Sequence, residues 1–300
     1  MAVQNSLTTT KKTSLSAYLT NDAVKMQINK VVGGKDGAKF ISSLMSAVQA
    51  TPALQECSNT SLVNAAMLGH ALNLSPSPQL GQFYMVPFKN NKKNTVEAQF
   101  QLGYKGYIQL AIRSGQYKKL NVLEIKEGEL IKYDPLNEEL EVNLIEDDEI
   151  RENTPTTGYY AMFEYGNGFR KTMYWSRKKM LTHADKYSAA FSASKLADLQ
   201  AGKIPDKDLW KYSSFWYKDF DGMAKKTMLR QLISKWGIMS IEMQQAFEGD
   251  MGVIKEDLTA DYVETAEESE VVAEQEAVEA PEPVTESKST DDDLGEEFFK

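Results

Sequence analysis

The spacing of the apolar residues changes period twice along this chain, and that change restricts its fold more than any other feature. Over residues 36–72 apolar side chains recur every three or four positions, which indicates two helices. From 83 to 175 the period is two, as in half-buried strands, apart from one helix predicted over 103–114. Helical spacing returns over 177–186 and 209–236. Helices, then strands, then helices predict an α+β fold with an N-terminal helical part.

The strands are expected to form two hairpins and a meander, all antiparallel. The hairpin strands are Phe83–Phe88, Val96–Leu102, Tyr159–Tyr165 and Phe169–Trp175. Gly166-Asn167-Gly168, between the last two, is a strong hairpin-turn signal. The meander strands are 120–125, 129–133 and 139–144, and the acids of 145–153 are expected in its outer loop.

Charge is distributed unevenly, although the formal net charge is only −9. Residues 255–300 contain 17 Asp and Glu against three Lys, which leaves the rest of the chain at +5. The acidic segment 255–300 has too few aromatic and branched residues for burial to offset the entropy cost of ordering it. We therefore expect a flexible N-terminus over 1–20, a folded body over 21–250 and a disordered acidic tail over 251–300. A basic body with an acidic arm is typical of proteins that hold a polyanion.

Several function classes are disfavoured by what the sequence lacks. The apolar run Leu62–Leu74 is far short of the ~20 residues that a membrane span requires. No secretory signal is visible and Cys57 is the single cysteine, so a reducing cytoplasm is expected. The glycine-rich stretch 33–39 lacks the Gly-Lys-Ser/Thr ending of an ATP-binding loop. His70 and His183 are far apart and have no metal-ligand spacing. We expect no metal, no cofactor and no enzymatic reaction.

The most informative stretch runs from a strand through two glycines into a helix. The strand carries Gln101, and the first turn of the helix carries Tyr104, Lys105 and Tyr107. Backbone N–H groups at a helix start attract phosphate, glycine permits close approach, and tyrosine can stack on a base. The same residues could equally pack the turn between strand and helix.

Three segments carry a resemblance to a known family: 99–122, ending Arg113-Ser114-Gly115-Gln116-Tyr117-Lys118-Lys119; 221–230, Asp-Gly-Met-Ala-Lys-Lys-Thr-Met-Leu-Arg; and 234–237, Ser-Lys-Trp-Gly. Together they resemble the RecT family of phage-type recombinases, over roughly 36–247. The resemblance implies a phage-derived protein in the cytoplasm of a bacterial host. It also implies that the protein binds single-stranded DNA, assembles into rings or filaments and anneals complementary strands without ATP. It also implies antiparallel strands backed by a long helix, with DNA in a basic groove. Residues 21–250 would then be the annealing, DNA-binding and oligomerisation domain.

The second of these segments can be placed on a helix. At about 100° per residue, Lys226, Thr227, Arg230 and Ser234 share one side, and Leu229, Leu232, Ile233 and Trp236 share the other. We expect the apolar side to pack and the cationic side to be free for a DNA backbone. Lys225 falls inside the apolar side, so it either snorkels or indicates an error in the helix phase.

Cations interleaved with aromatics suggest further contacts, because sequence-tolerant strand binding combines phosphate contacts with stacking. Trp175 and Lys179 belong to one such group. The candidate DNA-binding residues are Gln101, Tyr104, Lys105, Tyr107, Arg113, Lys118, Lys119, Arg170, Lys171, Lys178, Lys211, Trp216, Lys226, Thr227, Arg230 and Lys235.

Two alternatives to annealing remain. A passive single-strand binding protein would hold DNA without accelerating the pairing of complements. A Mg²⁺-dependent nuclease could use the consecutive acids at 146–149, although such runs are more typical of a solvated face. The expected partners are single-stranded DNA, annealed duplex, further copies of the chain, a partner exonuclease and a host single-strand binding protein.

Overall fold

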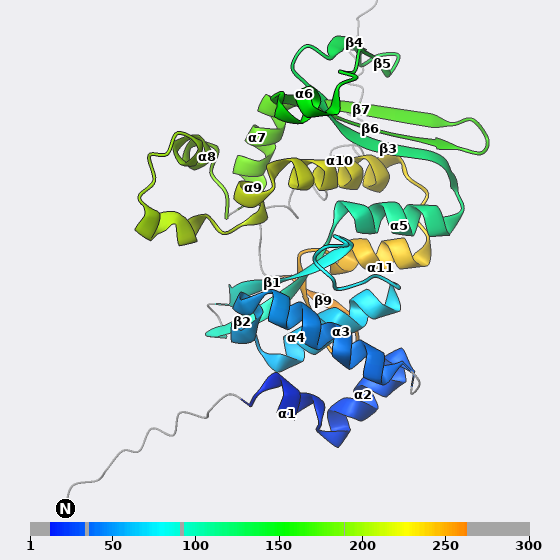
Figure 1. Ribbon diagram of the computed structural model, residues 1–300. Coiled ribbons are helices and arrows are strands. Elements are labelled where there is room, and N and C mark those ends of the chain that lie inside the picture. Colours follow the sequence, from blue (N-terminus) through cyan, green and yellow to red (C-terminus); the bar gives the residue numbers. More distant parts are fainter. Residues whose placement is uncertain (1–12, 34–35, 91–92, 189, 263–300) are drawn as a thin grey trace, which may run out of the picture.

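The computed structural model describes residues 13–33, 36–90, 93–188 and 190–262. It is an α+β fold arranged in tiers around one helix, α10 (Phe220–Trp236). In Figure 1 one sheet lies above α10, whereas α5 (Tyr104–Ser114) and α11 (Ile241–Gly249) lie below it. The hairpin of β1 (Phe83–Asn90) and β2 (Thr95–Leu102) lies lowest, together with the N-terminal helices. The predicted fold class is confirmed.

The N-terminal helices form the lowest tier. They are α1 (Leu15–Leu19), α2 (Asp22–Val32), α3 (Gly37–Ala50) and α4 (Asn59–Ala71), with a 3₁₀ turn, η1, at Pro52–Glu56. The Ser58 hydroxyl caps α4 by accepting from Ser61 N, and α4 is buried along most of its length. Because α1 begins at Leu15, the expected flexible N-terminus does not extend to residue 20; residues 1–12 lie outside the described chain.

The lower sheet combines strands that are far apart in the sequence. Its order is β1-β2-β8-β9, formed by β1 (Phe83–Asn90), β2 (Thr95–Leu102), β8 (Gly252–Ile254) and β9 (Ala260–Asp261). Val253 lies opposite Gln99, and β8 is buried. The expected start of a disordered tail at 251 is therefore wrong, since the fold continues through β9. A three-residue strand is too short for a periodicity signal, and residues 263–300 lie outside the described chain.

The upper sheet is antiparallel but differs from the expected meander. Its order is β3-β6-β7, with β3 at Tyr117–Lys126, β6 at Thr156–Tyr165 and β7 at Arg170–Ser176. The predicted hairpin at Gly166-Asn167-Gly168 is confirmed. The first meander strand pairs with β6 instead, whereas β4 (Leu130–Asp134) and β5 (Glu139–Val142) pair only with each other. Together with the short helix α6 (Asp148–Asn153), they form a separate lobe above the sheet (Figure 1).

The remaining helices connect and flank the two sheets. They are α5 (Tyr104–Ser114), α7 (Arg177–Tyr187), α8 (Ala193–Gln200), η2 (Asp206–Tyr212), α9 (Phe215–Lys218), α10 and α11 (Ile241–Gly249). Gly115 ends α5 with φ +67°, directly after the helix predicted over 103–114. The predicted long helix over 209–236 is interrupted, because the backbone of Asp219 is not helical (φ −147°, ψ 72°) and its side chain caps α10 by accepting from Gly222 N.

Both sides of α10 are packed. Leu229 and Ile233 belong to the lower core with α4, α5 and the lower sheet, whereas Met228 and Leu232 belong to the upper core with β6, α7 and α9. A helix between two cores has no free face along its middle. Among the described helices, none has the length and apolar character needed to cross a membrane.

Candidate nucleic-acid interface

The cations of α10 that were expected to face DNA are turned into the protein. Asp250, fully buried between α11 and β8, accepts hydrogen bonds from Lys226 Nζ at 3.0 Å and Arg230 Nη1 at 2.7 Å. Thr227 is also buried, and the Arg230 side chain is only 26% exposed. The expected free cationic side is therefore wrong for these residues. The reason is the central position of α10, which packs on both sides.

Asp250 is an acid held in its ionised form. Burial alone would raise the pKa of its carboxyl, but the charges of Lys226 and Arg230 and the hydrogen bonds that it accepts hold the pKa below its usual value. Leu102 N and the Tyr107 hydroxyl are its other donors. One carboxylate thus joins β2, α5, α10 and the start of β8. Lys225, the residue that did not fit the predicted helix phase, pairs with Glu124 of β3 at 2.7 Å.

The strand-to-helix turn before α5 is built for close packing. A Cβ on Gly103 would lie 2.1 Å from Gly81 O, and one on Gly106 would lie 2.1 Å from Gln82 O. Tyr107 is fully buried. These glycines and this tyrosine serve the fold, which favours the packing alternative for them.

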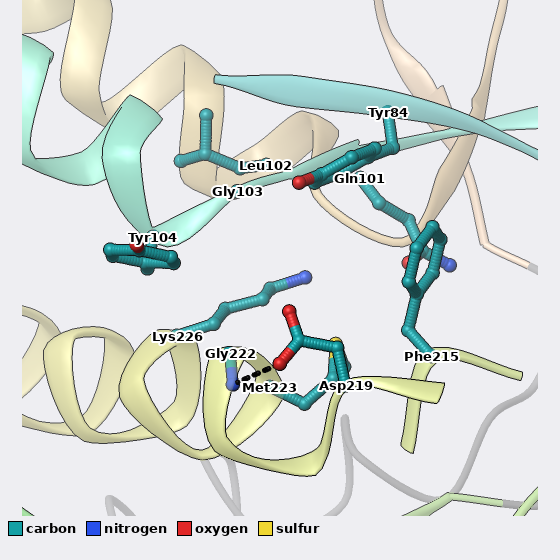
Figure 2. Close-up of a pocket in the computed structure, with 10 residues that line it drawn as sticks. All are labelled: Tyr84, Gln101, Leu102, Gly103, Tyr104, Phe215, Asp219, Gly222, Met223 and Lys226. Atoms are coloured by element: carbon teal, nitrogen blue, oxygen red, sulfur yellow. Dashed lines mark hydrogen bonds between the residues drawn. The ribbon is translucent and has the colours of Figure 1, made fainter. Parts of the chain in front are cut away.

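Gln101 and Tyr104 line a small pocket at the start of α10. Figure 2 shows them with Tyr84, Phe215 and Asp219 around the ammonium of Lys226. The cavity measures about 30 Å³, which is room for a water molecule but not for a nucleobase. Lys105 is exposed beside it, 6.0 Å from the Tyr104 ring centroid.

The other predicted residues occupy different surroundings. Trp216 is buried in the upper core, and Arg113 donates to the carbonyls of the two residues that follow α4, Leu72 and Asn73. Lys118 pairs with Glu164, and Lys211 pairs with Asp208. Exposed cations remain at Lys119 and Arg170 on the outer sheet face, at Lys178 on α7 and at Lys235 at the end of α10.

Cations and aromatic rings gather along the β7 edge, α7 and the end of α10. Lys171 Nζ lies 3.7 Å from the centroid of the Trp236 ring, and Lys179 Nζ lies 4.3 Å from that of Trp175. Lys186 Nζ lies 4.4 Å from the Tyr187 ring. We call this surface the β7 strip, defined as Lys171, Trp175, Lys179, His183, Lys186, Tyr187 and Trp236.

Local structure explains why the strip forms. Strand alternation places Lys171 and Trp175 on the same face of β7, the face toward α10. The Ser176 hydroxyl caps α7 by accepting from Lys179 N, and helical spacing then aligns Lys179, His183 and Lys186. Lys171 Nζ also contacts Glu138 Oε1 of the β4–β5 turn at 2.5 Å, so a phosphate at this position would compete with a carboxylate.

The pKa of His183 indicates that the strip is electropositive. Its ring packs against Trp175 and Tyr187, with centroid distances of 5.2 and 4.7 Å. Burial, together with the nearby charges of Lys179, Lys186, Arg230 and Lys235, lowers the pKa of His183 to about 4. Four cations around one neutral imidazole make this surface electropositive, and an anion bound there would be favoured.

The sequence predicted only part of the strip. Lys171 was among the candidate DNA-binding residues, and Trp175 and Lys179 belonged to one of the groups of cations and aromatics. The other strip residues, Lys186, His183, Tyr187 and Trp236, were not predicted. Helical spacing from Ser176 could have located Lys186 and His183. Trp236 was assigned to the packed side of α10, yet half of its surface is exposed, because the helix ends beyond the upper core.

The acids proposed for a nuclease do not converge. Within the described ranges no three His, Cys, Asp or Glu side chains gather as a metal site would need. Asp147 instead caps α6 by accepting from Ile150 N at 3.0 Å. These acids form a solvated face of the lobe.

Cations and aromatic rings side by side on an α+β fold are the two kinds of group that sequence-tolerant nucleic-acid binding combines. Comparison with known proteins agrees. The RecT family model matches residues 38–272, so the chain belongs to the RecT family, whose proteins act in recombination and single-strand annealing.

Two curated relatives align along most of their length. The chain is 37% identical over 257 residues to the uncharacterized protein YqaK of Bacillus subtilis (strain 168), covering 86% of this chain and 77% of YqaK. It is 27% identical over 259 residues to protein RecT of Escherichia coli (strain K12), covering 85% and 86%. The resemblance noted in the sequence is confirmed.

Proposed function

We propose that this protein binds single-stranded DNA along the β7 strip and anneals complementary strands without ATP, as a binding and assembly activity rather than a bond-making one. The observation that carries the proposal is the alternation of cations and rings, Lys171 with Trp236 and Lys179 with Trp175. Family membership supports the recombination and annealing role.

The chemistry of the strip suits a strand of any sequence. Lysines contact phosphates, which every nucleotide carries, and indole rings stack on the faces of bases. Neither contact uses the Watson–Crick edges. A strand held in this way can pair with an incoming complement, and base pairing then supplies the specificity. Further copies of the chain along the strand would extend the bound array.

The test of the strip is a pair of substitutions with a matched control. Lys179→Ala should weaken binding of a short labelled oligonucleotide and flatten the slope of log K against log[salt] by about 0.7, because one phosphate contact is lost. Trp236→Ala should cost about 1–3 kcal/mol of binding free energy and leave the salt slope unchanged, because only stacking is removed. Lys30→Ala, an exposed lysine on α2, should change neither quantity.

Fluorescence anisotropy at several salt concentrations provides both readouts. Unchanged affinity in both strip variants would remove the strip from the DNA path. Annealing of two labelled complements, with and without ATP, tests the rest of the proposal. We expect equal annealing rates with and without ATP, and a strict ATP requirement would contradict the proposal. Binding of DNA without faster pairing of the complements would indicate a passive single-strand binding protein.

A further inference from the structure

One carboxylate of the lobe reaches the β7 strip. Glu138, at the end of the β4–β5 turn, accepts a hydrogen bond from Lys171 Nζ at 2.5 Å and another from Thr172 N at 3.2 Å. Both members of the ion pair are largely withdrawn from solvent, since 29% of the Glu138 side chain and 19% of the Lys171 side chain are exposed. An ammonium and a backbone N–H of an edge strand thus hold a single anion.

These two donors are of the kind that bind the phosphates of a nucleic acid. Phosphate oxygens accept hydrogen bonds from lysine side chains and from backbone N–H groups. Lys171 Nζ also lies 3.7 Å from the centroid of the Trp236 ring, and half of the surface of Trp236 is exposed. A nucleotide whose phosphate replaced the Glu138 carboxylate would therefore have an indole beside it on which its base can stack.

The β4–β5 turn is shaped to deliver the carboxylate. Asp134 closes the turn by accepting hydrogen bonds from Leu136 N at 2.9 Å and from Asn137 N at 3.3 Å. Glu138 follows with φ +57°, a left-handed conformation that residues with a Cβ seldom adopt. Such a backbone persists where its surroundings hold it, and here the contacts of the Glu138 side chain with β7 do so.

The β4–β5 hairpin is hinged at its base and latched near its tip. Among the described strands, β4 and β5 pair with each other and not with either larger sheet. At the base, Glu129 accepts from Arg151 Nε of α6 at 2.7 Å, and farther along the hairpin the Tyr133 ring lies 5.3 Å from that of Tyr174 on β7. Glu138 provides the charged contact at the tip.

We infer that Lys171 Nζ and Thr172 N form a phosphate site for the bound strand, and that Glu138 occupies this site until a phosphate displaces it. The assignment rests on the proposed function and deepens it, because it names how access to the β7 strip is regulated. Carboxylate and phosphate exclude each other, so strand binding weakens the latch as much as the latch weakens strand binding.

The charge of the lobe favours its displacement by DNA. Residues 127–152 contain 11 acids and two bases, a net charge of −9. A strand bound at the strip repels such a segment. Binding of the strand should therefore release the hairpin, while the contact between Glu129 and Arg151 keeps its base in place.

Glu138→Gln tests the site in the full chain, because glutamine can still accept from Thr172 N but carries no charge to pair with Lys171. Affinity for a short single-stranded oligonucleotide should rise about fivefold or more. The slope of log K against log[salt] should steepen by about 0.7, because phosphate binding no longer frees a carboxylate that takes up a cation. Glu141→Gln removes an exposed acid from the same hairpin and is the matched control, which should leave both quantities nearly unchanged. When Lys171→Gln is also present, Glu138→Gln should have no larger effect than this control.

Hydrogen exchange measures the release of the hairpin directly. A two-stranded hairpin is only marginally stable by itself, so its release should speed exchange of the amides over 130–142 when a saturating oligonucleotide is added. Glu138→Gln should speed the same exchange before DNA is added. The amides of α4, which lies in the lower core, should be unaffected.

Three results would overturn the inference: a gain in affinity no larger than that of Glu141→Gln, an equal gain when Lys171→Gln is present, or exchange over 130–142 that is unchanged or slower with DNA. Lys179→Ala tests the proposed function separately, because Lys179 belongs to the strip but not to the Glu138 site. Unchanged binding by Lys179→Ala means that the strip proposal has failed. Weaker binding by Lys179→Ala, with Glu138→Gln equal to its control, means that the phosphate site alone has failed.

Discussion

At the scale of single residues, the ionisable groups of this protein are positioned by partners distant in sequence. Lys226 and Arg230 were expected at the surface but meet Asp250, which lies after the next helix. His183 is instead surrounded by cations from α7 and α10 and is held neutral at pH 7. In both cases the residue type indicated that the side chain can carry a charge, whereas its partners in the fold determined what that side chain does.

His183 should make stability depend on pH. Its pKa is lowered to about 4 in the folded protein, against 6.5 as its ordinary value, so the unfolded chain binds more protons between these pH values. This contribution to stability is complete above about pH 6.5 and is lost as pH falls toward 4. Thermal unfolding should therefore shift down between pH 7 and pH 5 by more than in His183→Phe, which keeps a ring against Trp175 but cannot titrate. Equal shifts in both proteins would contradict the assignment.

At the scale of elements, α10 is the structural centre because it belongs to both cores. Its N-terminal end is capped by Asp219, its middle is anchored by Asp250, and its C-terminal end emerges at the β7 strip with Trp236. The short strand β8 begins two residues after Asp250 and pairs with β2. The anchor of α10 and the C-terminal edge of the lower sheet are thus one continuous segment.

Asp250→Asn should be strongly destabilising. It leaves a buried Lys226 and a largely buried Arg230 without an opposite charge, a change that typically costs about 3–5 kcal/mol. Urea unfolding should show a lower midpoint with a similar slope. Asp257→Asn, an exposed acid in the β8–β9 turn, serves as the control and should stay within about 0.5 kcal/mol of the unchanged protein. A loss below about 1 kcal/mol for Asp250→Asn would mean that the carboxylate is not the anchor.

At the scale of the whole molecule, opposite charges occupy separate regions. Acids concentrate in the lobe and in residues 263–300, whereas the β7 strip is basic. Residues 263–300 carry 14 acids and two lysines. We expect their net charge of −12 to oppose the approach of DNA phosphates, most strongly at low salt, where screening is weakest.

Deleting residues 263–300 changes the formal charge from −9 to +3 and should tighten binding of single-stranded DNA at about 50 mM salt, where the Debye length exceeds 10 Å. The difference should shrink at higher salt, and the thermal unfolding transition should remain. Deleting 251–300 also removes β8 and should lower the unfolding temperature, because β2 then keeps β1 but loses its other partner strand. If the protein that lacks 263–300 binds single-stranded DNA more weakly than the full chain, these acids do not oppose DNA binding.

Local patterns in the sequence determined which segments are helices and which are strands. The change of period from 3.6 to two, the cap at Ser176 and the stop at Gly115 are short-range properties that a segment carries wherever it lies. They also sufficed for the second hairpin and for the family resemblance, because those motifs are contiguous. The expected meander shows the limit, since β3 prefers β6 over its nearest neighbour in sequence.

Only the tertiary structure decided which side chains face solvent. The period of α10 shows two sides but not that both are packed, because its second core comes from the upper sheet and α7. Asp250 turned Lys226 and Arg230 inward, and the convergence of β7, α7 and the end of α10 assembled the strip. The physical reason is that burial and charge pairing depend on contacts between residues tens to more than a hundred positions apart, which no local pattern contains.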